Sequence, residues 1–397
     1  MILHPRLDVN IKQHSSKIFN NTSIGEKMTF KNTIKAIAIS AGLLALIGCG
    51  STDSSSNAKE ESTNAKLFAY GVSSDYKSGE LRFGDLDSLE LGSDTLGFGG
   101  DAKLFSNGKY VYILAPSNIT VINASEASKG ESAILAQVSI GDYAYPASIS
   151  FNSDSTAWLI ENGTTNAVKI DAITLDAIDT ISLAKYAQEG SLSANAVASV
   201  ITGDTLAILI GRLDNYNATE VGLVALFNTN SGKLLDTIPL NTLNPTAMGT
   251  YKGKLIVATQ GTYNASYSCD ADSLRALESV DLSKKKSTVL ATGKDFGGGL
   301  YKLAIDSESG VAYVSVYASY GSVPLAAYDF TTNKVTNLSK VGDAEGALYF
   351  DSESELLFVG DRSYGSEALY AYDGTNFTKI KVSSDVLPSY SATVARW

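Results

Sequence analysis

The chain has 397 residues, of which 31 are basic and 42 are acidic, so its formal net charge at neutral pH is −11. Nucleic-acid phosphates and anionic membrane surfaces repel a chain this acidic, which argues against both as partners of its surface. With 44% hydrophobic residues and only two cysteines, a chain of this length can bury a core without a disulfide framework.

The segment before residue 50 has the order of an export signal. Lys31 and Lys35 precede an apolar run from 36 to 48, which is too short to span a bilayer because a span needs about 20 residues. The run ends in Leu46-Ile47-Gly48-Cys49, which resembles the lipobox of bacterial lipoproteins. The resemblance implies cleavage before Cys49, acylation of that cysteine and attachment to a membrane through its lipid.

Removal of residues 1–48 as a signal peptide, whose true start we place at Met28 or at Met1, changes the chemistry of the chain. It leaves 25 basic and 40 acidic residues, a net charge of −15. Both histidines, His4 and His14, are also lost. A Ser-His-Asp triad and His-ligated metals are thereby excluded from the mature chain, and we expect no metal site and no cofactor.

Residues 49–65 are rich in Ser, Thr, Asn, Lys and Glu and predict a disordered tether between lipid and folded domain. Gly50, and not an aspartate, follows the cysteine. By analogy with lipoprotein sorting in Gram-negative cells, this favours the outer membrane. We therefore expect a protein of the cell envelope that faces the periplasm or the cell exterior.

From residue 66 to 397 the chain repeats itself, most clearly at 310–334. Residues 311–316 alternate like a half-buried strand, 325–329 form a second strand and 331–334 a turn. The middle strand of each unit ends at an Asp or Asn, whose side chain can bond the backbone two residues on and so end the strand in a turn. These seven residues are Asp85, Asn123, Asp171, Asn228, Asp281, Asp329 and Asp373.

The apolar strands that precede these seven Asp and Asn residues recur every 43 to 57 residues. Four-stranded propeller blades repeat at roughly 40–50 residues, so the period predicts an all-β, seven-bladed β-propeller. The first strand of the chain, at Leu67, has the pattern of the second strand of a blade. Residues 390–396 form a lone inner strand, which we expect to complete that blade and close the ring. The candidate inner strands begin near Ala102, Ala147, Ala196, Thr246, Lys302, Ala347 and Ser391.

The repeat resembles the YVTN and YncE-like β-propeller repeat of bacterial exported proteins. The matching segments are 111–113 with 119–123 and 157–160 with 168–171, together with Gly-Asp pairs such as Gly100-Asp101 and Gly342-Asp343. The resemblance implies the fold and says little about function.

In a propeller, the loops between the second and third strands (B–C loops) and those between blades (D–A loops) share one rim, where ligands usually bind. Long loops with aromatic and polar side chains suit recognition of a partner. Soluble loops rich in tyrosine are the alternative explanation. The B–C loops place these candidates on the rim: Tyr76, Arg212, Tyr216, Tyr263, Tyr267, Tyr320, Arg362 and Tyr364.

Arg212 and Arg362 suit a carboxylate or a sugar acid, or else they pair with Asp214 and Asp361. Cys269, in the longest loop, is either an oxidisable thiol or a small buried residue. Residues 351–355 lack the spacing of a calcium loop and predict a solvated turn.

Two functions from different classes fit these features. The first is a monomeric, non-catalytic lipoprotein whose rim binds a protein or a glycan. The second is a propeller enzyme, similar to a lactonase, a quinoprotein or a glycosidase, that uses rim carboxylates. The absence of histidine in the mature chain and its two tryptophans weigh against the second, although glycoside hydrolysis needs only two carboxyl groups about 5–9 Å apart.

Overall fold

The computed structural model describes residues 64–72, 78–214, 217–263, 272–319, 321–338, 340–382 and 390–397. The predicted export signal, Cys49, the tether up to residue 63 and Cys269 lie outside them. Residues 61–397 form one compact unit, and its first strand begins at Ala65. None of the helices in the described part of the chain is long and apolar enough to cross a membrane.

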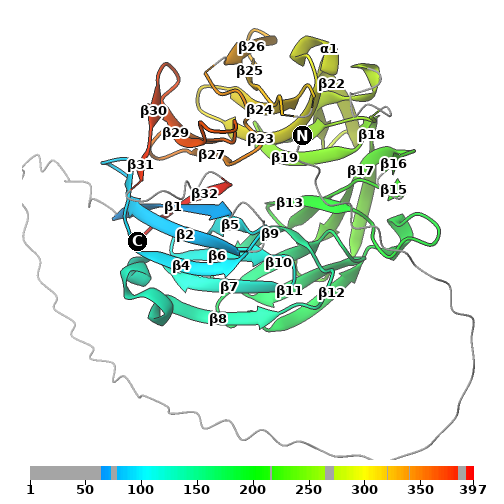
Figure 1. The fold of residues 1–397 in the computed structure, drawn as a ribbon. Coiled ribbons are helices and arrows are strands. Elements are labelled where there is room, and N and C mark those ends of the chain that lie inside the picture. The colour runs from blue at the N-terminus through cyan, green and yellow to red at the C-terminus, as the bar shows by residue number, and fades with distance from the viewer. Residues whose placement is uncertain are drawn as a thin grey trace, which may run out of the picture. The chain divides into compact units, whose positions relative to one another are not determined.

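This unit contains seven four-stranded antiparallel sheets; in six of them the strands follow the order of the chain, and in the seventh the C-terminal strand lies beside the N-terminal one. Around the ring, each sheet contacts the next through its first or second strand, and the chain passes once around the ring (Figure 1). The prediction of a seven-bladed β-propeller is therefore confirmed. We number the blades from the one that contains the first strand.

Each blade has an inner strand A, followed outward by strands B, C and D. The A strands of blades 1 to 7 are β32 (Ser391–Arg396), β5 (Lys103–Ser106), β9 (Pro146–Ser153), β13 (Ala196–Thr202), β19 (Pro245–Tyr251), β23 (Gly299–Asp306) and β27 (Leu348–Asp351). The B strands are β1 (Ala65–Val72), β6 (Tyr110–Ala115), β10 (Thr156–Glu161), β14 (Thr205–Ile210), β20 (Lys254–Thr259), β24 (Val311–Tyr317) and β28 (Leu356–Asp361).

The outermost strand of each blade, strand D, is the most exposed one. The C strands are β2 (Ser78–Asp85), β7 (Asn118–Asn123), β11 (Asn166–Asp171), β17 (Val221–Asn228), β21 (Ala276–Asp281), β25 (Leu325–Asp329) and β29 (Ala368–Tyr372). The D strands are β4 (Thr95–Gly99), β8 (Ile134–Ser139), β12 (Ala177–Ser182), β18 (Leu234–Leu243), β22 (Lys286–Thr292), β26 (Lys334–Leu338) and β30 (Phe377–Lys379).

Short elements lie between these strands. β3 (Glu90–Leu91) pairs in parallel with β31 (Lys381–Val382), and this pairing of blade 1 with blade 7 was not predicted. β15 (Leu213–Asp214) and β16 (Asn217–Ala218) form a small hairpin. The helical segments are η1 (Ala124–Ala133), η2 (Ala184–Tyr186), η3 (Asp272–Leu274) and α1 (Gly293–Phe296).

The B strands form the core of each blade. β24 is buried from Ala312 to Val316, so the prediction of a half-buried strand at 311–316 is wrong. Neighbouring blades cover both faces of each sheet, and a strand covered on both faces is apolar along its whole length. Trp158 of β10 is fully buried in this way and donates from Nε1 to the Thr229 carbonyl at 3.3 Å.

The ring closes where the C-terminal strand pairs with the N-terminal one. β32 pairs antiparallel with β1 from Ser391 to Arg396, as predicted. Arg396 donates two hydrogen bonds to Asp351 at the end of β27, one of them from Nη1 at 2.6 Å. Because Asp351 is only 3% exposed, the prediction of a solvated turn at 351–355 is wrong for this residue. Burial would raise the pKa of Asp351, but Arg396 and Ser354 outweigh it and hold that pKa below its usual value.

The Asp or Asn that ends each C strand has the predicted local role in all seven blades. Its Oδ1 accepts a hydrogen bond from a backbone N–H two residues on, at 2.6 to 3.2 Å. In Asp281, the Ser283 hydroxyl and the Lys284 amide lower the pKa to about 2. Backbone amides likewise lower the pKa of Asp171, Asp329 and Asp373.

We expect Arg396→Met to lower the free energy of unfolding by about 3 kcal/mol, because it leaves a buried carboxylate without its partner. Chemical denaturation followed by tryptophan fluorescence measures this change. Lys129→Met is the control, since it breaks an exposed ion pair with Glu126 and should cost no more than about 0.5 kcal/mol. Equal costs for the two variants would contradict a role for Arg396 in ring closure.

We also expect the C-strand aspartates to make stability pH-dependent. Their pKa values are lower in the folded chain than the unfolded value of about 3.9, so the stability they contribute is full above pH 4 and is lost as pH falls toward 2. Replacing Asp171, Asp281, Asp329 and Asp373 by Asn should keep the turns, as Asn123 and Asn228 do in blades 2 and 4. The melting temperature of this variant should fall less between pH 4 and 2 than that of the natural protein. An unchanged acid profile would show that other groups dominate.

Candidate functional site

The B–C and D–A loops meet at one end of the ring, which we call the rim. Backbone hydrogen bonds join the two kinds of loop. Gly163 N donates to the Ala144 carbonyl at 2.9 Å, and Arg362 N donates to the Asp343 carbonyl at 2.8 Å. The rim is therefore cross-linked by its own backbone.

The predicted rim residues fall into two groups. Arg212, Tyr263, Arg362 and Tyr364 belong to the described part of the chain. The other four tyrosines lie outside it, so their place stays a prediction; they are Tyr76, Tyr216, Tyr267 and Tyr320.

Arg212 forms an ion pair with Glu220, which lies in the same β14–β17 loop. The Arg212 carbonyl accepts a hydrogen bond of 3.2 Å from Gln188. Arg362 lies 3.5 Å from Glu345, measured from Nη1 to Oε2. Both arginines thus have a glutamate partner that the sequence reading did not name.

Tyr263 packs inward. Its ring meets the ring of Tyr317 edge to face at 5.3 Å, and its hydroxyl is buried without a partner among the described residues. Burial raises the pKa of Tyr263 above its usual value. Tyr364 is the opposite case, because its side chain is 95% exposed.

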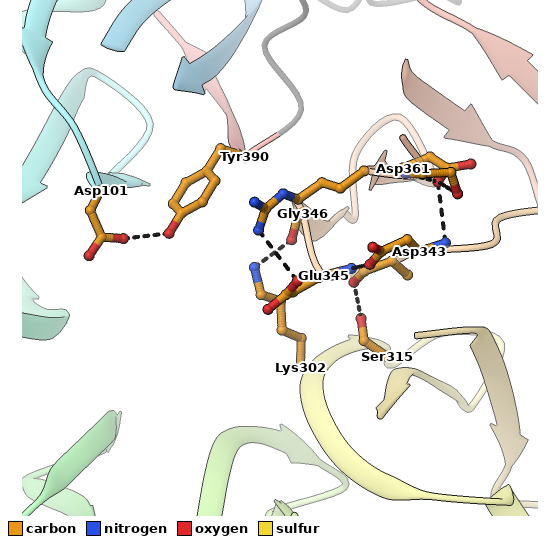
Figure 2. A network of polar contacts seen from close by, with 11 residues as sticks. Asp101, Lys302, Ser315, Asp343, Glu345, Gly346, Asp361 and Tyr390 are labelled. Atoms are coloured by element: carbon orange, nitrogen blue, oxygen red, sulfur yellow. Dashed lines mark hydrogen bonds and ion pairs between the residues drawn. The ribbon is translucent and has the colours of Figure 1, made fainter. Parts of the chain in front are cut away.

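A group of charged and tyrosine side chains gathers where the rim meets the inner strands. We call it the axial cluster. It combines side chains from four blades and from both kinds of rim loop, and Figure 2 shows part of it. Its members are Asp101, Lys103, Tyr301, Lys302, Glu345, Arg362 and Tyr390.

Direct contacts hold two sides of the cluster. The Tyr390 hydroxyl donates to Asp101, and the Arg362 guanidinium lies 5.2 Å from the centre of the Tyr390 ring. On the other side, the Lys302 ammonium donates to the Gly346 carbonyl. Figure 2 shows the Tyr390 ring pointing toward Asp101, and the Lys302 side chain pointing toward the loop that carries Glu345 and Gly346.

The charges of the cluster act on one another. The pKa of Lys302 is lowered to about 7, mainly by burial and also by Lys103 and Arg362, while Glu345 and Asp101 oppose the shift. The surrounding protein lowers the pKa of Lys103 as well. Burial and Glu345 raise the pKa of Tyr301 to about 12.

Two buried aspartates position the loop that carries Glu345. Asp361 accepts hydrogen bonds from the Asp343 amide at 3.2 Å and the Ser363 amide at 3.0 Å. Asp343 accepts one from the Glu345 amide at 3.2 Å. Ser315 donates to the Ala344 carbonyl at 2.7 Å in the same loop. Each of these two carboxylates therefore holds the backbone of a rim loop in place.

A β-bulge shapes the inner strand below. The pairing of β23 with β24 skips Tyr301, which makes it the bulged residue. A bulge changes the direction in which neighbouring side chains point. The strands β9, β13 and β19 have a register shift at the same end, so this irregularity is a feature of four successive blades.

Tyr143 and Tyr145 are a second feature of the rim, in the D–A loop between β8 and β9. They are 73% and 45% exposed, and both have left-handed backbone, with φ of 69° and 44°. Tyr145 N donates to the Pro116 carbonyl at 2.9 Å, and its own carbonyl accepts from Asn162 N at 3.0 Å. The loop therefore holds two exposed aromatic rings on a fixed backbone.

Sequence reasoning missed these residues for identifiable reasons. The rim prediction was built on the tyrosines of the B–C loops, whereas Tyr143, Tyr145 and Tyr390 lie in D–A loops. Lys103 and Lys302 had a usable signal, because they are the only lysines in the seven inner strands as the structure defines them.

Among the residues that the structure describes, no group of three or more Cys, Asp, Glu or His side chains is placed to hold a metal ion.

No protein-family model matches this chain, and no curated protein matches its sequence. Solved structures match its fold. A functionally unknown protein from Desulfotomaculum acetoxidans has a TM-score of 0.55 and 11% identity, over 83% of this chain and 98% of its own. Hydrazine synthase of Kuenenia stuttgartiensis has a TM-score of 0.56 and 11% identity, over 81% of this chain and 99% of its own. Apo AztD from Citrobacter koseri has a TM-score of 0.52 and 12% identity, over 84% of this chain and 98% of its own. At these identities the likeness supports the propeller fold alone.

Proposed function

We propose that this protein is a lipoprotein of the cell envelope, anchored through acylated Cys49, whose propeller rim binds a protein or a glycan without catalysing a reaction. The observation that carries the binding role is the rigid rim that presents Tyr143, Tyr145 and Tyr364 to solvent. Large exposed aromatic side chains on fixed backbone offer contact area at low entropic cost.

The backbone at Tyr143 and Tyr145 supports this role. Left-handed backbone is unfavourable for residues other than glycine, and such strain gathers at functional sites. A tyrosine at each position keeps a bulky ring where Gly or Asn would fit the backbone better.

The non-catalytic part of the proposal draws on the contacts of the carboxylates in the axial cluster and in the neighbouring loops. Asp101 accepts from Tyr390, and Glu345 pairs with Arg362. Asp343 and Asp361 accept from backbone amides. Each of these carboxylates thus has a hydrogen-bond or ion-pair role within the fold, and the proposal assigns none of them to general acid or nucleophilic chemistry.

The anchoring part draws on the lipobox resemblance at residues 46–49. We expect Cys49→Ser to move the protein from the detergent phase to the aqueous phase of a Triton X-114 separation, because the acyl chains alone would hold it in the membrane. Cys269→Ser is the matched control and should partition like the natural protein. Detergent-phase partitioning of the Cys49 variant would contradict lipid anchoring.

We expect the triple change Tyr143→Asn, Tyr145→Asn and Tyr364→Ala to abolish binding of the rim partner and to leave the melting temperature unchanged within a few degrees. Asn tolerates left-handed backbone better than Tyr, so the loop should not be destabilised. A glycan array and a cross-linked envelope fraction supply the candidate partners.

The control for this experiment changes exposed apolar residues away from the rim. Ile178 and Leu235 lie on the outer strands and are 53% and 54% exposed, so Ile178→Ala with Leu235→Ala should bind normally. Equal binding by the rim variant and this control would refute the rim as the binding surface.

A further inference from the structure

Exposed apolar side chains gather on the part of the rim that surrounds blade 3. Tyr143 and Tyr145 belong to the D–A loop that enters this blade, and Leu192 belongs to the D–A loop that leaves it. Their exposed fractions are 73%, 45% and 87%. We call these three residues the blade 3 patch. Single exposed apolar side chains are common on protein surfaces, whereas a group of them at one place marks an interaction site.

The B–C loop of blade 3, residues 162–165, holds both D–A loops. Asn162 N donates to the Tyr145 carbonyl at 3.0 Å, and the Ser193 hydroxyl donates to the Asn162 carbonyl. The backbone of Tyr145 and the residue after Leu192 are thus bonded to the same residue. This shared contact places the two parts of the patch side by side.

The two tyrosine rings form the aromatic part of the patch. Their centres are 6.4 Å apart, and their planes are inclined by 48°. Gly163 lies directly against this loop, because a side chain at its position would overlap the Tyr143 carbonyl and the Tyr145 ring. The rings are therefore held on packed backbone, so a partner that covers them has little loop motion to restrict.

Polar side chains at the patch are already bonded within the fold. Asn162 donates from Nδ2 to the Ala196 carbonyl at 3.1 Å, Thr164 donates to Glu161, and Ser193 donates to the Asn162 carbonyl. A glycan on this surface would find few unpaired groups besides the tyrosine hydroxyls, and burying sugar hydroxyls without partners costs free energy. An apolar protein side chain carries no such cost.

The charges beside the patch are mainly acidic. Asp142 lies in the loop of the two tyrosines, and Glu189 lies in the loop of Leu192. Both are exposed, and neither forms an ion pair within the described part of the chain. Lys185, the one basic residue of the two loops, lies 4.7 Å from the centre of the Tyr186 ring and does not balance both carboxylates. Lysine or arginine in a partner would complement them.

We propose that the rim partner is a protein, and that a segment of it with apolar side chains flanked by lysine or arginine packs on the blade 3 patch. This inference rests on the proposed function and names the class of the partner and its place on the rim. Tyr364, in the B–C loop of blade 7, lies outside this contact. Aromatic side chains at the centre of a contact and charged groups at its edge are the usual arrangement of protein interfaces.

A phage-displayed library of short random peptides tests the proposal, with the purified natural protein in detergent as the bait. We expect the selected peptides to be rich in aromatic and aliphatic residues, and to contain more Lys and Arg than Asp and Glu. Synthetic copies of these peptides should bind more weakly as salt is raised from about 50 to about 300 mM, because salt screens charges at the surface.

Variants of the protein locate the contact. Leu192→Ser should weaken binding of the synthetic peptides at least about tenfold, because the contact would no longer bury the leucine. Asp142→Asn with Glu189→Gln should weaken binding and reduce its salt dependence. Tyr364→Ala is the matched control, since it removes a rim residue that is 95% exposed, and it should bind normally. All four residues lie at the surface, so melting temperatures should stay unchanged and confirm that each variant folds.

Three results would overturn the proposal: no peptide enriched, equal binding by Leu192→Ser and the natural protein, or selected peptides rich in Asp and Glu. A glycan array separates this inference from the proposed function. A glycan whose binding depends on Tyr143 and Tyr145 but not on Leu192 would refute a protein partner and leave the rim as the binding surface.

Discussion

Closure of the ring by the C-terminal strand is the constraint on which the other features depend. β32 supplies the inner strand of a blade whose other three strands come from the start of the propeller, and Arg396 ties it to Asp351 in blade 7. Ser391 also accepts a hydrogen bond of 3.0 Å from Leu104 N in blade 2. Without this strand, β1 would present an unpaired edge.

The axial cluster exists only in the closed ring. Tyr390 directly precedes β32 and bonds Asp101, which is 289 residues away in sequence. The opposite end of the ring is different, because each turn after a C strand is held by an Asp or Asn of the same strand. The turns at that end are therefore alike in all seven blades, whereas the rim loops differ from blade to blade.

The repeat was readable because its signals are local. A buried B strand is a run of apolar residues, and the turn after each C strand needs one acceptor side chain at a set position. The predictions of burial were wrong where distant residues surround a side chain. They assigned Asp351 to solvent because Arg396 is far away in sequence, and they treated 311–316 as half-buried because the covering blade is not visible in the repeat.

The sequence by itself determined the number of blades, the position of their inner strands, the closing strand and the arginines and tyrosines of the B–C loops, because each of these has a signal within one repeat. Only the tertiary structure decided which side chains meet at the rim. It paired Arg362 with Glu345, joined Tyr390 to Asp101, turned Tyr263 inward and left Tyr143 and Tyr145 exposed on strained backbone. The physical reason is that the ring's curvature brings together the ends of inner strands from separate blades, and no repeat records which charges its distant neighbours carry.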